Sequence, residues 1–156
     1  MDNKDYRLAV LGKMLEMAEN TAFEDEIGFL YDHFIPLAKG VANIDSPPII
    51  CASRLIELRL WVFREEKFPE MIFSKRDLTT YGNKLFIPFK VFSPELKSVD
   101  FEELTKEFRN DLIGLIGLIE PMFELSMTYD AKEGEFTIEI LSKEEDLVKE
   151  LIYGIH

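Results

Sequence analysis

The sequence contains few of the residues from which metal and redox sites are built. It has one cysteine, Cys51, and two histidines, His33 and His156. A single cysteine excludes a disulfide bond within the chain, and neither an HExxH motif nor a pair of CxxC motifs occurs. We therefore expect no metal ion and no cofactor. His33 is interpreted as a structural or surface residue, because its neighbour Asp32 would point about 100° away on a helix.

The motifs that support acyl transfer and nucleotide binding are also absent. The chain has no GxSxG, no P-loop and no GxGxxG sequence, and these motifs carry the usual nucleophile and phosphate sites. Cys51 falls on the apolar face of a predicted helix, where free cysteines are commonly buried, so we interpret it as an inert core residue. These absences favour a binding protein over an enzyme.

Long apolar runs are missing as well. The longest nearly uncharged stretch, residues 112–119, is shorter than the roughly 18 residues that span a bilayer. The N-terminus, MDNKDYRLAV, lacks the basic and apolar regions of a secretion signal. The sequence therefore predicts a cytoplasmic protein without a membrane segment. Its length of 156 residues, with 47% apolar and 31% charged residues, predicts a single globular domain over 1–156.

Basic charge is scarce, and it is unevenly distributed. The net charge is −12; residues 46–97 hold nine basic and six acidic residues (+3), whereas residues 98–156 hold five basic and fifteen acidic ones (−10). This balance argues against binding of nucleic-acid phosphates and of anionic membranes. It favours either a solvated acidic surface or a protein partner with a basic surface.

Apolar periodicity predicts three helices in the first half of the chain. The first covers residues 4–19 with an inner seam of Leu8, Leu11, Leu15 and Ala18, and the second begins at a capping box of Thr21 and Glu24. Pro36 should end or kink this second helix near Ile35, which makes the pair a helical hairpin, and residues 39–45 should form the loop into the central helix. A central helix should run from Pro47 to Glu66, with Ser46 as its N-cap.

The second half of the chain carries the strand signals. Residues 85–92 predict a strand that Pro88 places at a sheet edge, and residues 123–130 and 135–141 alternate as a hairpin turning at Gly134. Asp100 should cap a helix over 101–119, and Ser142 with Glu145 should open a C-terminal helix. We therefore predict an α+β fold, in which a helical hairpin and a central helix pack on an antiparallel sheet of about three strands, with a C-terminal helix.

Two residues of the central helix break its pattern. Arg59 lies in the apolar face and, if buried, needs an acidic partner, for which the first two helices offer candidates: Glu16, Glu19, Glu26 and Asp32. Trp61 lies on the other, solvent-facing side of the predicted helix, among charged residues such as Glu57. A helix with large apolar side chains on both faces is either sandwiched between layers or exposes one face to a partner. A tryptophan flanked by Arg54 and Arg64 also has the composition of an interface hot spot.

These observations support one leading functional hypothesis and two alternatives. The leading hypothesis is an acidic protein-binding module of the immunity, antitoxin, inhibitor or adaptor type, without catalysis, that engages a basic protein; a homodimer stays open. The first alternative is an anion-binding protein or enzyme with Arg59 in its site, and the second is a mimic of nucleic acid. The candidate interaction or ligand residues are Arg54, Arg59, Trp61, Arg64, Glu124, Glu135 and Glu139.

Overall fold

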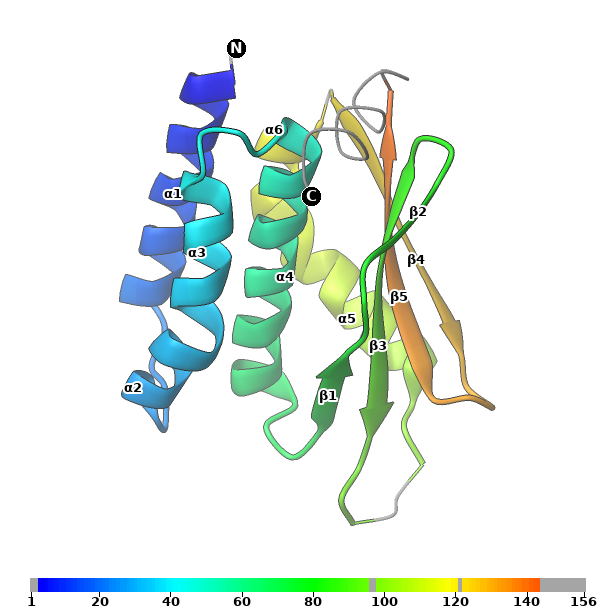
Figure 1. The fold of residues 1–156 in the computed structure, drawn as a ribbon. Coiled ribbons are helices and arrows are strands. Elements are labelled where there is room, and N and C mark those ends of the chain that lie inside the picture. The colour runs from blue at the N-terminus through cyan, green and yellow to red at the C-terminus, as the bar shows by residue number, and fades with distance from the viewer. Residues whose placement is uncertain (1–2, 96–97, 121, 144–156) are drawn as a thin grey trace.

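The computed structural model describes residues 3–95, 98–120 and 122–143, and it confirms a mixed α+β architecture. Helices α1 and α3 form one outer layer, α4 and the α5–α6 segment form the middle, and a five-stranded antiparallel sheet covers the other side (Figure 1). The elements are α1 (Asn3–Glu19), α2 (Glu26–Phe29), a π-helix η1 (Leu30–Phe34), α3 (Ile35–Ala42), α4 (Pro48–Lys67), β1 (Ile72–Lys75), β2 (Thr79–Tyr81), β3 (Lys84–Phe92), α5 (Phe101–Asp111), a 3₁₀ turn η2 (Leu112–Leu115), α6 (Ile116–Ile119), β4 (Phe123–Asp130) and β5 (Glu135–Ser142). None of the described helices is both long and apolar enough to cross a membrane.

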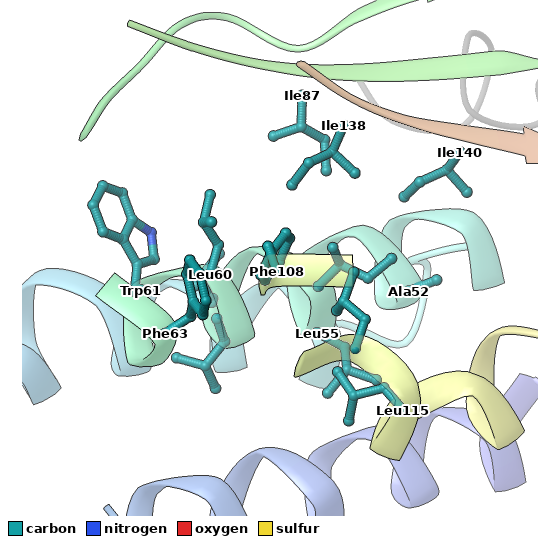
Figure 2. Close-up of a cluster of buried hydrophobic side chains, with 14 of the residues drawn as sticks. Ala52, Leu55, Leu60, Trp61, Phe63, Ile87, Phe108, Leu115, Ile138 and Ile140 are labelled. Carbon is teal, nitrogen blue, oxygen red and sulfur yellow. The ribbon is translucent and has the colours of Figure 1, made fainter. Parts of the chain in front are cut away.

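Helix α4 is sandwiched between the helical layer and the sheet. Fourteen of its 20 residues are buried, which covers its whole circumference and includes Leu60 and Trp61. Figure 2 shows Trp61 and Leu60 directed toward the sheet, while Leu55 lies near Leu115 of η2 on the helical side. The sandwiched interpretation of Trp61 is therefore confirmed. Ser46 does not cap the helix, because its hydroxyl donates to the carbonyl of Gly40 at 2.6 Å and Pro47 is the N-cap.

Helix α1 is present as predicted, but it buries a different seam. Leu8 and Leu15 are more than half exposed, whereas the buried residues are Tyr6, Val10, Met14 and Met17. Both stripes are apolar, so periodicity could not choose between them. The buried seam includes Tyr6, whose hydroxyl donates to the carbonyl of Leu118 at 2.7 Å and ties α1 to α6.

The second predicted helix is three helical segments in continuous succession. It begins at Glu26 rather than at Thr21: Asp25 accepts from the backbone N–H of Gly28, and the Thr21 hydroxyl donates back to Met17 O. Pro36 does not end it, and α3 continues to Ala42, into what was predicted as a loop. The wider π-helical turn immediately precedes Pro36, in the turn where an α-helix would need the N–H that proline lacks.

The sheet is larger than predicted, with the order β1-β3-β5-β4 and β2 also paired to β3. Residues 72–75 and 79–81, for which the sequence pattern predicts no strand, form β1 and β2. Strand β3 therefore lies inside the sheet, and the prediction that Pro88 occupies an edge is wrong. Pro88 is tolerated because it falls between the stretches paired with β1 and β2, where its carbonyl accepts from Arg76 N.

The hairpin of β4 and β5 and the helix start at Asp100 are confirmed. Asp100 accepts from Glu103 N at 3.0 Å, and Gly134 turns the hairpin with φ of 68°. The helix after Asp100 loses regularity in the 3₁₀ turn at 112–115, next to Gly114 and Gly117, where an added Cβ would meet nothing within 4 Å. These glycines thus mark an imperfect helix and not a close contact. The predicted C-terminal helix lies outside the described residues.

Candidate functional site

A cleft of about 430 Å³ opens beside the C-terminal half of α4. It is bounded by η1 and the start of α3 on one side and by the end of β1 on the other. Figure 1 shows α3 and β1 on opposite sides of α4. Most of its lining residues are polar or charged. The full lining consists of Asp32, His33, Pro36, Leu37, Arg54, Glu57, Trp61 and Lys75. Arg54 and Trp61 were predicted as candidate site residues, and the cleft brings them together.

Glu57 is the most buried charged group of the cleft. Only 5% of the residue is exposed, although the helix pattern had placed it on the solvent face. One carboxylate oxygen accepts from the Trp61 indole N–H at 3.2 Å and the other meets Lys75 Nζ at 2.6 Å. The i,i+4 spacing along α4 brings the first pair together, and the second joins α4 to β1. Glu57 is therefore neutralised within the protein.

His33 and Trp61 form the aromatic wall of the cleft. Their rings stack at a centroid distance of 4.1 Å and an interplanar angle of 22°. Burial lowers the pKa of His33 and outweighs the opposite effects of Asp32 and Glu57, so the imidazole is neutral at pH 7. His33 lies in the π-helical segment, a rare conformation that is frequent at functional sites.

Arg54 contributes an unmatched donor. Its Nε is buried and has no hydrogen-bond acceptor among the described residues. The side chain lies over Gly40 of α3, where an added Cβ would stand 3.0 Å from Nε. No ion pair within the described part of the chain involves Arg54. The cleft therefore contains a guanidinium whose hydrogen-bonding capacity is not used internally.

The remaining predicted arginines are engaged elsewhere. Arg64 donates to the backbone carbonyls of Met71 and Pro69, which fixes the turn between α4 and β1. Arg59 makes a two-pronged ion pair with Asp111, at 2.5 Å from Nε and 2.9 Å from Nη2. Its partner thus lies on α5, and the prediction of a partner on the first two helices is wrong. A second cleft, of about 270 Å³, adjoins this pair.

The three predicted glutamates lie on the open face of the sheet. Glu124 is on β4, and Glu135 and Glu139 are on β5, with side chains pointing away from the core. Glu139 accepts from the Ser126 hydroxyl at 3.1 Å. They share no lining with the cleft, so the predicted residues are distributed over several separate regions.

Sequence reasoning missed three members of the cleft, which are His33, Glu57 and Lys75. The i,i+4 spacing of Glu57 and Trp61 was visible, but the helix pattern assigned Glu57 to water. Lys75 had no local signal, because β1 has only four residues. In the described part of the chain, no group of three or more histidine, cysteine, aspartate or glutamate residues is arranged to hold a metal ion.

Cys51 is expected to be unreactive in the folded protein. The residue is 1% exposed, and burial raises the pKa of its thiol to about 11. At pH 8 its thiolate fraction is therefore on the order of a hundredfold below that of a free cysteine. A thiol-specific chromogenic reagent should label it only after unfolding in denaturant. Rapid labelling of the native protein would contradict the core assignment.

Comparisons of the chain with protein-family models, with curated proteins and with solved structures find no match.

Proposed function

We propose that the protein binds a small ligand through a carboxylate or phosphate group, and that Arg54 in the cleft is its principal donor. The observation that carries this proposal is the guanidinium of Arg54, which lines the cleft, makes no ion pair with the described residues and has a buried Nε without an acceptor. An anionic ligand in the cleft would gain charge-assisted hydrogen bonds from this guanidinium, which is the role for which the group is best suited.

The charge balance of the cleft supports an anion over a cation. Glu57, the buried carboxylate, is already paired with Lys75 and the Trp61 indole. His33 is neutral at pH 7, and Asp32 lies on the exposed rim. Arg54 is therefore the one charged group of the interior that is free to meet a ligand among the residues lining the cleft.

The size of the cleft supports a small molecule. A volume of about 430 Å³ lies at the lower end of the range for ligand pockets, which is about 300 to 1,000 Å³. The sequence had suggested an anion site on the central helix at Arg59. The proposal keeps the helix but moves the site by five residues to Arg54, because Asp111 already occupies the guanidinium of Arg59.

Tryptophan fluorescence provides a direct test, because Trp61 is the only tryptophan in the chain and lies in the wall of the cleft. Inorganic phosphate and succinate are titrated in parallel, which distinguishes a phosphate from a carboxylate ligand. Saturable changes are expected for at least one of them. Arg54→Gln should weaken binding about 10- to 100-fold, the equivalent of one hydrogen bond to a charged group.

Arg76→Gln serves as the matched control, because Arg76 is exposed and does not line the cleft. It removes the same charge and should leave the affinity unchanged. The NMR signals of His33 give a second readout, since a bound anion raises the pKa of the neighbouring imidazole. Equal weakening in both variants, or a His33 pKa unchanged at saturating ligand, would contradict the proposal.

The protein-binding hypothesis favoured by the sequence concerns a different region and is kept as a second candidate. It is supported by the acidic side chains on the open face of β4 and β5. A cytoplasmic location, expected from the sequence, belongs to both proposals and is consistent with the single, buried and free Cys51.

A further inference from the structure

Strand β4 forms one edge of the sheet, and its outer backbone groups are unpaired within the described residues. Lys143 N donates to Met122 O, and β4 and β5 pair in the register Glu124↔Leu141. In an antiparallel ladder, the N–H and C=O groups of successive residues point alternately to the two sides of a strand. The even-numbered residues of β4 therefore face β5, and the odd-numbered ones direct both backbone groups to the open edge.

A mainly apolar groove, whose lining also includes Arg109 and Glu120, runs beside this edge on the inner face of the sheet. It has a volume of about 130 Å³ and lies between β4 and the α5–α6 segment. Leu125 and Met127 line it from β4, and Ile116, which is 41% exposed, lines it from α6. Leu125 and Met127 are also among the residues whose backbone groups face the edge. A strand added at this edge would consequently place alternate side chains in the groove.

The outer face of the same edge is acidic. Glu124 and Asp130 point outward from β4, and Glu135 and Glu139 lie on the neighbouring strand in the same face. A strand added to β4 would bring its outward side chains next to this row. Basic side chains at those positions would be attracted, and acidic ones would be repelled.

We propose that the β4 edge receives an extended segment of a partner protein in which basic and apolar residues alternate. The segment pairs antiparallel with β4, its apolar side chains enter the groove beside Leu125 and Met127, and its basic side chains lie along Glu124 and Asp130. Strand addition of this kind obtains affinity from backbone hydrogen bonds and specificity from alternate side chains. This interaction is independent of the anion cleft on the other side of α4.

A second copy of the chain fits the same edge less well. Pairing β4 with itself would bring another set of Glu124 and Asp130 onto a row that is already acidic. The same-face repulsion disfavours such a dimer, and the net charge of −12 acts in the same direction. Charge complementarity therefore selects a basic partner.

The test uses a capped, fluorescently labelled peptide of about eight residues that alternates lysine and valine, the length of β4. Anisotropy should show saturable binding. In the antiparallel arrangement the valine positions oppose the odd-numbered residues of β4 and exchange hydrogen bonds with them. N-methylation of two valines should therefore weaken binding at least about tenfold, whereas N-methylation of two lysines should have little effect.

Protein variants test the edge from the other side. Met127→Pro removes one outward N–H, a change that edge strands tolerate, and Met127→Ala is its control because it removes the side chain but keeps the N–H. The proline variant should bind the peptide several-fold more weakly than the alanine variant. If Met127→Pro does not fold, as judged by circular dichroism, the N-methylated peptides decide the question on the wild-type protein.

The acidic row is tested with Glu124→Gln/Glu139→Gln against Glu24→Gln/Glu26→Gln, a pair of exposed residues on the distant helical layer. At low salt the first variant should lose about fivefold in affinity and the second should lose none; at about 0.5 M salt the difference should disappear. Equal effects of both variants, or of both N-methylated peptides, would overturn the proposal. So would a concentration-dependent dimer that Met127→Pro abolishes, because the edge would then belong to a second copy.

Discussion

Replacing Asp111 with alanine is expected to lower the free energy of unfolding by about 3 kcal/mol, the lower end of the cost of breaking a buried ion pair. Asp111 and Arg59 are 12% and 18% exposed at their side chains and are joined by two hydrogen bonds. Removing the carboxylate leaves the guanidinium with its desolvation cost and without its partner. Arg59→Met should be destabilising for the same reason. Urea denaturation followed by circular dichroism measures both changes.

The double variant Arg59→Met/Asp111→Leu replaces both members of the ion pair with apolar side chains, so that no charge is left without its partner. Because apolar replacements of a buried pair are often neutral or stabilising, we expect it to lie within about 1 kcal/mol of the wild type. Glu107→Ala, which breaks the exposed pair with Lys67, is the control and should cost less than about 1 kcal/mol. A stability of Arg59→Met equal to or above that of the wild type would favour the sequence hypothesis of an anion subsite at Arg59.

Replacing Phe108 with alanine is expected to be at least as damaging, with a loss of about 3 to 5 kcal/mol. Phe108 is fully buried. The centroid of its ring lies 5.2 Å from that of Phe63 on α4 and 6.3 Å from that of Phe136 on β5. It therefore fills the space between the middle helices and the sheet (Figure 2). Truncation removes apolar contacts on both sides and leaves a cavity that three rigid elements cannot close.

Phe92→Ala is the matched control for this variant. Phe92 is 47% exposed at the end of β3 and lies opposite Ile72. Its removal should cost about 1 kcal/mol or less, because little buried surface is lost. Chemical denaturation of both variants measures the difference. Similar losses would show that Phe108 is not the contact on which the packing of α5 depends.

The local sequence pattern was sufficient to predict the helices and strands that have strong periodicity or clear end signals. The central helix, the helix start at Asp100 and the hairpin turning at Gly134 were all predictable, because proline, aspartate and glycine act through the backbone of their own segment. Strands β1 and β2 were missed because three or four residues, such as IFSK and TTY, are too short for alternation to be recognised. The edge position of residues 85–92 was predicted from the missing N–H of Pro88, and without β1 and β2 nothing in the sequence contradicted it.

The features that determine the candidate site depend on contacts between distant residues. Arg59 pairs with a residue 52 positions away, and nothing near Arg59 distinguishes Asp111 from Glu16 or Glu26. Glu57 was assigned to solvent because helix periodicity describes one buried face, whereas α4 is buried on both. The cleft itself requires η1, α4 and β1 to meet, and no single segment carries its signal.

The strand order has a consequence for the order of folding during synthesis. Strand β5 lies between β3 and β4 in the sheet but is the last of the five strands to be made. Helix α4 is therefore synthesised well before the strand that covers it. The aromatic side chains of α4 that are buried in the folded protein stay uncovered until residues 135–142 have been made. Pairing of β3 with β5 also joins residues as far as 57 positions apart, as in Lys84↔Leu141, and such non-local contacts slow folding. The apolar side of α4 that faces the sheet is thus uncovered in the nascent chain until β5 has been made.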